Sequence, residues 1–305
     1  MGEISSSGYK DYVAGLLAGV SAVATGHPFD TVKVKLQKHN AEPHLVQYRN
    51  GLHCTARIFK TEGLKGFYRG ATSSFAGMAL EGSLFFGIYS QTKQYLQGGV
   101  QNGAPRPQVI LPSAALSGAI ISFVLGPTEL IKCRMQIQGA DSLVPMSSRY
   151  SSPFDCIAKT LKTEGVKGIF RGSVTTLLRE SVGNATFLTV YEYMRYHMHS
   201  HIKPASSNYN NLIEMGIGVV TGGIGGVAFW VVAMPLDVAK TLIQTNPDKN
   251  CQRNPFMVLS SIYKRTGLKG CYTGLGPTLS RAFPANAATI VTWELASKLL
   301  GVRHD

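Results

Sequence analysis

The chain reads Pro28-Phe29-Asp30-Thr31-Val32-Lys33, then Pro127-Thr128-Glu129-Leu130-Ile131-Lys132, and again Pro235-Leu236-Asp237-Val238-Ala239-Lys240. Each stretch has a proline, an acid two residues later and a lysine three residues after the acid. Each copy then closes a second segment with a glycine, and these are Gly70, Gly172 and Gly274, 102 residues apart both times. Regular self-similarity of this kind indicates repeats of one structural unit. We expect three repeats, at residues 1–107, 108–206 and 207–305.

A stretch without charged residues leads into each proline motif and suits a membrane span. These stretches cover residues 12–29, 107–128 and 215–236, close to the roughly 20 residues that a helix needs to cross a bilayer. Nine residues before the prolines stand Gly19, Gly118 and Gly226, and thirteen before stand Gly15, Ala114 and Gly222. Small residues four apart let helices approach closely in lipid. A loose glycine-rich loop is the alternative, but a loop would not repeat this register three times.

A second helix is predicted in each repeat, from the closing glycine to an aromatic residue typical of a membrane interface, over residues 70–89, 172–191 and 274–293. Basic, polar segments separate the two helices, and each is expected to hold a short amphipathic helix, near residues 52–61, 154–163 and 256–265. The predicted fold is an all-α membrane protein with six transmembrane helices, arranged as three pseudo-threefold repeats. The prolines should kink the first helix of each repeat.

Composition excludes several classes of protein. The 305 residues are 44% hydrophobic and only 15% charged, which excludes a disordered chain. A net charge of +13 is typical of proteins that meet nucleic acid, anionic membranes or anionic substrates. The basic residues recur at span ends in each repeat, whereas a nucleic-acid binder would gather them on one face with stacking aromatics. We therefore expect no nucleic-acid partner.

Catalytic and metal-binding patterns are not found. The sequence has no Ser/His/acid set and no phosphate-cradling glycine loop, so we do not expect an enzyme. Five widely spaced cysteines without a Cys-x-x-Cys pair indicate neither a disulfide framework nor a zinc site, and no cofactor or metal is expected. Residues 1–12 lack the features of a removable targeting segment.

The repeated motifs resemble the signature of the mitochondrial carrier family. The resemblance rests on the Pro-x-acid-x-x-Lys segments and on the segments from Glu62-Gly63 to Tyr68-Arg69-Gly70 and from Glu164-Gly165 to Phe170-Arg171-Gly172. It implies a monomer in the inner mitochondrial membrane, both termini in the intermembrane space, and lipid contacts that include cardiolipin at the matrix-side helix ends. The third copy departs from the family pattern, because Leu242, Thr266 and Thr273 replace a base, an acid and a base.

The acid and lysine of each proline motif share a helical face, so three such pairs can join head to tail in a ring. The expected partners are Asp30 with Lys132, Glu129 with Lys240, and Asp237 with Lys33. In the family resembled, this ring closes the pore on the matrix side, and Gln37, Gln136 and Gln244 match the braces beneath it. Solvated surface pairs worth about 0–1 kcal/mol each are the alternative interpretation.

The opposite gate is expected to be weak. Family members carry aromatic, acid, any, any, base on the second helices, and here only Lys93 and Glu294 keep both charges of a head-to-tail pair. Arg195 would face Ser90 and Glu192 would face Ser297, which leaves hydrogen bonds without ion pairs. Opening toward the intermembrane space should therefore cost less free energy than opening toward the matrix.

A substrate without threefold symmetry must be held by residues that break the repeat. Arg179 and Arg281 lie seven residues after their closing glycines, where the first repeat has Gly77. Glu180 and Glu81, at offsets of eight and eleven, are likewise charged where their repeat partners are neutral. Charges at membrane depth normally face an aqueous cavity and mark a binding path. Ion pairing among these four residues without a ligand is the alternative.

Two bases and two acids fit an amino acid better than a polyanion. A guanidinium can bind an α-carboxylate with two hydrogen bonds, a role assigned to Arg281 with Arg179 assisting, while Glu81 and Glu180 hold the ammonium and a cationic side chain. These residues and the run from Arg281 to Asn286 resemble the contact residues of carriers for basic amino acids. The resemblance implies exchange of arginine, ornithine, lysine or histidine. A carnitine or acylcarnitine carrier is the alternative within the fold, and a proton leak or a scaffold is the alternative outside substrate transport.

Overall fold

The computed structural model describes residues 3–42, 46–97, 106–139, 141–142, 149–201, 210–246, 248 and 251–300. All regular secondary structure in these residues is helical, and each repeat contributes two long helices separated by one or two short ones. The helices are α1 (Glu3–Ala41), α2 (Gly51–Phe67), α3 (Ala71–Gln97), α4 (Pro107–Ile137), α5 (Pro153–Glu164), α6 (Val166–Ile169), α7 (Ser173–His201), α8 (Asn210–Thr245), α9 (Pro255–Cys271) and α10 (Leu275–Leu300). The predicted order of helices is confirmed. The second helix of each repeat runs past the aromatic residue at which it was expected to end.

The connecting segments repeat the same backbone features in all three units. The side chains of Asn50, Ser152 and Asn254 accept hydrogen bonds from backbone N–H groups in the first turn of the helices that follow, which satisfies donors that a helix start leaves unpaired. A glycine with φ between 64° and 68° then bends each segment, at Gly63, Gly165 and Gly267. The closing glycines also have positive φ, between 80° and 92°. Only glycine adopts these conformations readily, so these positions set where each long helix begins.

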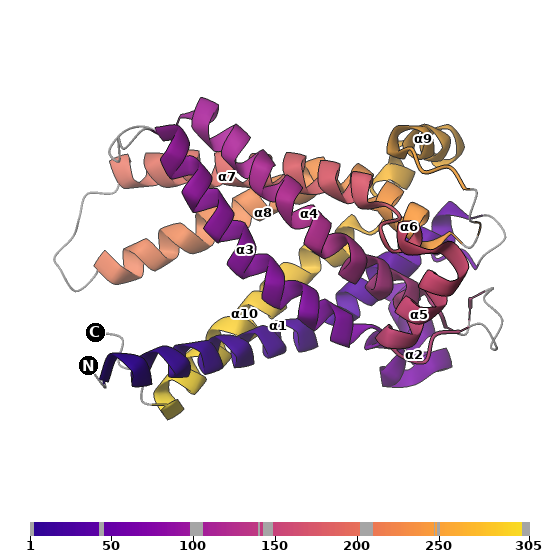
Figure 1. The fold of residues 1–305 in the computed structure, drawn as a ribbon, viewed down its shortest axis with the longest axis horizontal. Coiled ribbons are helices and arrows are strands. Elements are labelled where there is room, and N and C mark those ends of the chain that lie inside the picture. The colour runs from indigo at the N-terminus through magenta and orange to yellow at the C-terminus, as the bar shows by residue number, and fades with distance from the viewer. Residues whose placement is uncertain are drawn as a thin grey trace.

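The six long helices form a closed ring in the order α1, α3, α4, α7, α8 and α10, with each helix contacting the next and α10 contacting α1. Figure 1 shows the short helices α2, α5, α6 and α9 gathered at one end of the molecule, here called the short-helix end. Helix α1 begins, and α10 terminates, near the other end. This ring leaves its centre to be filled by side chains or water.

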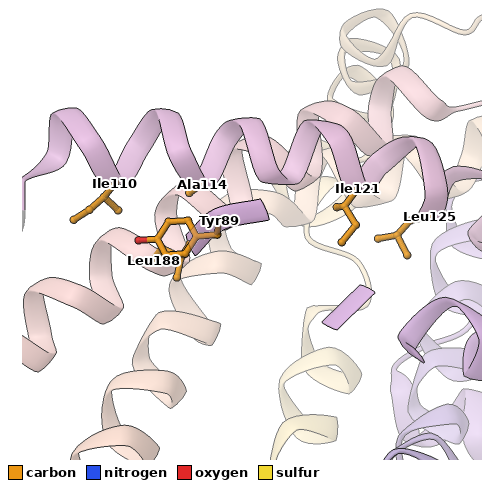
Figure 2. Packing of buried hydrophobic residues seen from close by; sticks show 6 residues of the cluster. All are labelled: Tyr89, Ile110, Ala114, Ile121, Leu125 and Leu188. Carbon is orange, nitrogen blue, oxygen red and sulfur yellow. The ribbon is translucent and has the colours of Figure 1, made fainter. Parts of the chain in front are cut away.

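Hydrophobic packing holds the ring where α3, α4 and α7 meet. Side chains along one face of α4 contact Tyr89 of α3 and Leu188 of α7 (Figure 2). Outward-facing side chains on the same helix are also apolar, as at Phe123, which is 61% exposed. An apolar outer surface of this kind is what lipid requires of a spanning helix.

Two described helical segments are long and apolar enough to span a membrane, judged by length and composition alone. They are Pro107–Ile137 and Gly216–Thr245. The second helices of the repeats carry charged residues within their length, such as Arg179, Glu180 and Arg281, which lowers their hydropathy. A helix of such a ring need not be uniformly apolar, because one of its faces can line an aqueous interior.

The small residues before the prolines do not act alike in the three repeats. An added Cβ at Gly118 would lie 2.6 Å from the carbonyl oxygen of Glu180, so α4 and α7 touch backbone to backbone there. At Gly19 the nearest atom would be the methyl of Met78, 3.6 Å away, and at Gly226 nothing lies within 4 Å. In the third repeat Gly225 is the glycine in contact, against the ring of Phe187 at 3.1 Å. The predicted register is therefore one residue off in that repeat.

Buried charges hold the short-helix end in the first two repeats. Glu62 pairs with Lys35 and with Arg69. Its counterpart Glu164 accepts from Arg134 at 2.6 Å and from Arg171 at 3.2 Å.

The third repeat replaces this charged cluster with an apolar one. Leu242 packs against a buried cluster that includes Val238, Ile262 and Cys271, and Thr266 donates to the backbone carbonyl of Ile262. Among the described residues of this repeat, hydrophobic contact takes the place of the charged cluster.

A further ion pair joins the first two repeats at the surface. Arg57 of α2 donates two hydrogen bonds to Asp141, at 2.7 and 2.8 Å, and the hydroxyl of Tyr48 donates a third at 2.9 Å. Hydrogen bonds from Arg57 lower the pKa of the Asp141 carboxyl. We call these three residues the Asp141 latch.

Candidate functional site

A cavity of about 240 Å³ lies inside the ring of long helices. All six long helices line it, each with at least one charged residue or serine hydroxyl, and α8 adds two aromatic rings. The charged residues in its lining are Asp30, Lys33, Glu129, Lys132, Arg179, Glu180, Asp237, Lys240 and Arg281. A polar chamber enclosed by helices with apolar outer faces is suited to binding a charged solute.

The three lysine–acid pairs of the proline motifs are all in contact, each joining neighbouring repeats. The Nζ of Lys132 lies 2.6 Å from Asp30, and that of Lys33 lies 2.8 Å from Asp237. Lys240 pairs with Glu129. The pairing is head to tail as the spacing predicts, and it forms a ring across the interior on the side of the short-helix end.

The three glutamines have different surroundings. Gln37 donates to Asp237 at 2.9 Å and accepts from Thr241 at 2.7 Å, so it supports one pair of the ring. Gln136 donates to the hydroxyl of Thr31 at 3.2 Å. Gln244 is buried, and its amide has no hydrogen-bond partner among the described residues. One of the three expected braces therefore contacts a ring carboxylate.

Both predicted site arginines reach the ring acids, a contact that the spacing of the motifs does not predict. Arg179 contacts Glu129 at 2.8 Å and Asp237 at 3.3 Å, and it also pairs with Glu180. Arg281 contacts Asp30 at 3.1 Å. Every carboxylate of the ring thus receives a second cation from a helix that carries the predicted binding residues.

Glu180 is buried in the cavity wall, and its two carboxylate oxygens have separate partners. One pairs with Arg179, and the other accepts from the side-chain amide of Asn184 at 2.9 Å. The side chains of the other predicted acid, Glu81, and of the residues around it lie outside the described part of the structure. Asn286 is exposed and is not among the described residues that line the cavity.

Several lining residues are not among those predicted from the sequence. His27 is buried next to Pro28, with one ring nitrogen 3.0 Å from the Ser74 hydroxyl and the other 3.0 Å from the Arg69 carbonyl. Phe229 and Trp230 supply an aromatic wall, and the Nζ of Lys33 lies 4.1 Å from the centre of the Trp230 ring. These residues also break the repeat in the sequence, because the other two repeats have no histidine before the proline and no aromatic pair at these positions.

At the end away from the short helices, Lys93 of α3 contacts Glu192 of α7 at 2.5 Å, and Tyr89 also donates to Glu192. The head-to-tail rule predicts that Lys93 pairs with Glu294, whose side chain lies outside the described residues. Arg195 bonds along its own helix, to the hydroxyl of Tyr191 at 3.3 Å. In this conformation Lys93 therefore takes a partner that the head-to-tail rule does not give.

Comparison with known proteins decides the family. The model of the family described as mitochondrial carrier protein matches three times, over residues 5–100, 107–201 and 213–304. The chain belongs to the mitochondrial carrier family. The family resemblance, the all-α fold and a role in transport follow directly for this carrier.

The chain is also similar to individual carriers whose names state a substrate. This carrier is 63% identical to the mitochondrial arginine transporter BAC1 of Arabidopsis thaliana, over 97% of its own length and 96% of the relative's. It is 34% identical to the mitochondrial basic amino acids transporter of Bos taurus, over 92% and 89% of the two chains. It is 33% identical to a mitochondrial carnitine/acylcarnitine carrier-like protein of Arabidopsis thaliana, over 96% and 99%.

Proposed function

We propose that this carrier exchanges cationic amino acids, chiefly arginine, across the inner mitochondrial membrane by alternating between two gated states. The observation that carries the proposal is that two guanidinium groups and a buried carboxylate, those of Arg179, Arg281 and Glu180, share one cavity above a ring of ion pairs. High identity to a protein named as an arginine transporter supports it. Ornithine, lysine and histidine share the same charged groups and are included in the substrate class.

Each charged group of the substrate has a partner in the site. Arg281, which is 35% exposed at its side chain, binds the α-carboxylate, and Arg179 assists, because a guanidinium can donate two parallel hydrogen bonds. Glu180 and Glu81 receive the α-ammonium and the cationic side chain. Glu81 is included on the sequence alone, and Asn286 is left out because it is not among the described residues that line the cavity.

The contacts of the two arginines couple binding to the matrix gate. Arg179 and Arg281 bind the ring carboxylates Asp30, Glu129 and Asp237, so a substrate carboxylate must compete with the ring for them. The Arg179 side chain is 8% exposed, and removing one partner from a buried ion pair costs about 3–5 kcal/mol, so its contacts help to keep the ring closed when the cavity is empty. Substrate supplies a replacement anion for the arginines and leaves the ring held by lysines alone.

The two ends of the carrier act as gates. The ring at the short-helix end is the matrix gate, braced by Gln37, with Gln136 and Gln244 at the equivalent positions of the other two repeats. The outer gate is formed by Lys93, Glu192, Arg195 and Glu294. Both termini face the intermembrane space, the carrier works as a monomer, and cardiolipin contacts the matrix-side helix ends. A matrix-negative potential favours entry of one positive charge by about 2.3 kcal/mol per 100 mV, whereas one-for-one exchange of equal charges is insensitive to it.

Carnitine is the second candidate substrate. Quaternary ammonium groups bind to aromatic faces, and Phe229 and Trp230 line the cavity. Against carnitine, the Trp230 ring already carries Lys33 on its face.

The test is counter-exchange in reconstituted liposomes loaded with arginine. Saturable uptake of labelled arginine is expected, with a loss of at least about tenfold in Glu180→Gln and in Arg281→Lys, since each removes a charge or a paired donor geometry. Thr186→Val on α7 is the matched control, because its hydroxyl bonds the Val182 carbonyl one turn back. Absence of saturable exchange, or a preference for carnitine over arginine, would overturn the proposal.

A further inference from the structure

Asn184 holds one oxygen of the Glu180 carboxylate. Its side-chain amide donates to Oε2 at 2.9 Å, from one turn further along α7. Glu180 is 3% exposed, so its carboxylate is held mainly by protein donors. A hydrogen bond to the charged form of a buried carboxylate stabilises that form.

The other oxygen of Glu180 depends on a cation that is shared. Arg179 pairs with Glu180 and also contacts Glu129 and Asp237 of the ring. One guanidinium therefore serves three carboxylates. A substrate carboxylate that engages Arg179 weakens its hold on Glu180, and Asn184 is then the donor that remains.

The backbone beneath Glu180 is fixed, so only its side-chain torsions are free. The Glu180 carbonyl lies 2.6 Å from where a Cβ would stand on Gly118 of α4. Beside it, the hydroxyl of Ser181 donates to the Ala115 carbonyl at 3.1 Å. Contacts of Arg179 and Asn184 therefore decide where the carboxylate points.

The second repeat is the one that has both an acid and an asparagine at these positions, Glu180 and Asn184. At the two positions the first repeat has Met78 and Gly82, and the third has Ala282 and Asn286. Because Asn286 has no acid one turn before it, the same residue type has no carboxylate to position there. A pair that breaks the repeat fits a substrate that lacks threefold symmetry.

We infer that Asn184 is a positioning residue, which keeps the Glu180 carboxylate charged and oriented while the substrate draws Arg179 away, and so sets the preference for cationic over neutral amino acids. The inference rests on the function proposed above. It assigns to Asn184 a part in selectivity that neither Arg179 nor Arg281 can supply, since both recognise the carboxylate that all amino acids share.

Transport of arginine and of citrulline separates this role from a structural one. Citrulline has a neutral ureido group in place of the guanidinium and is otherwise alike. In Asn184→Leu, which keeps the size and removes the donor, the half-saturation concentration for arginine should rise about tenfold, which corresponds to about 1.4 kcal/mol. That for citrulline should change less than about twofold. Asn184→Gln, which restores an amide, should recover most of the arginine preference, and Thr186→Val on the same helix should leave both values unchanged.

The outcomes are distinct. Equal effects on arginine and citrulline, or no effect on either, would overturn the role of Asn184 while exchange by the unmodified carrier still stood. If the unmodified carrier exchanged no arginine, the proposed function itself would fail. Should Asn184→Leu not fold, Asn184→Ala removes the same donor without adding bulk. The half-saturation concentrations for arginine and citrulline are then compared in that variant in the same way.

Discussion

Lys93 and Glu192 form an ion pair between α3 and α7 at 2.5 Å while the ring at the short-helix end is closed. The two side chains are 26% and 16% exposed, so the contact is partly shielded from water. It joins the first and second repeats at the end where the proposed outer gate lies. Glu192, whose expected partner Ser297 has no charge, is thereby available to Lys93.

A double-mutant cycle on Lys93 and Glu192 should give a coupling of about 1 kcal/mol in the thermal stability of the substrate-free carrier. The charge-swapped variant Lys93→Glu with Glu192→Lys should recover stability that either single change loses. The cycle of Lys93 with Glu294 is the comparison. If only that second cycle shows coupling, the pairing described here is wrong.

Gly118→Ala should destabilise the carrier by about 1–3 kcal/mol, because its methyl group meets the backbone of Glu180 and overpacks the contact of α4 with α7. Arginine exchange should fall with it. Gly226→Ala, at the same repeat position, is the matched control, since nothing lies within 4 Å of its added methyl. Equal melting temperatures for the two variants would contradict the close approach at Gly118.

Glu164→Gln should be among the most destabilising single changes. It removes the carboxylate shared by Arg134 and Arg171, whose side chains are 7% and 0% exposed, and a buried charge without its partner costs about 3–5 kcal/mol. Thr266→Val, at the corresponding position of the third repeat, should cost far less because it removes one hydroxyl. Thermal unfolding in detergent measures both.

Asp141→Asn should lower the melting temperature at neutral pH by removing the carboxylate of the latch. Since hydrogen bonds lower the pKa of Asp141 in the folded state, its stabilisation is complete above the ordinary carboxyl pKa of about 3.9 and is lost as the pH falls below it. The gap between the native and variant carriers should therefore stay constant from pH 8 to 5 and close in stronger acid. A gap that closes near pH 6 would point to a different group.

Maleimide at pH 7 to 8 should label Cys251 first. The other four cysteines are buried, and burial raises the pKa of Cys54 to about 12 and that of Cys156 to about 11, so these remain unreactive thiols at that pH. Mass spectrometry of the folded carrier should find one modified cysteine, and Cys251→Ser should prevent labelling. Rapid modification of Cys54 in folded protein would contradict the burial described here.

Much of the fold follows from the sequence because it is repeated. The period of 102 residues placed the proline motifs and the closing glycines in register, and the positive φ of Gly70, Gly172 and Gly274 shows why glycine stands there. The ends of the second helices were misplaced at Tyr89 and Tyr191, because these helices continue past the aromatic residues to Gln97 and His201. An interface aromatic marks membrane depth and does not end a helix.

The site was predictable only where spacing fixes the partner. An acid and a lysine on one face, repeated three times, determine the ring pairs. The reach of Arg179 and Arg281 to the ring acids depends on long side chains and on the distance between helices, which no spacing records. The pairing of Lys93 with Glu192 is likewise not given by the spacing, and the proposed role of Asn184 becomes visible only once the Glu180 carboxylate is placed.

The third repeat has an apolar cluster where the other two have buried ion pairs, so its short-helix end should respond differently to temperature. Hydrophobic contact weakens on cooling, whereas the desolvation penalty of ion pairs falls as temperature rises. Cold should therefore loosen the region around Leu242 before the regions around Glu62 and Glu164. The three repeats of this transporter therefore differ in how their stability depends on temperature. At low temperature the third repeat alone would limit the rate of transport.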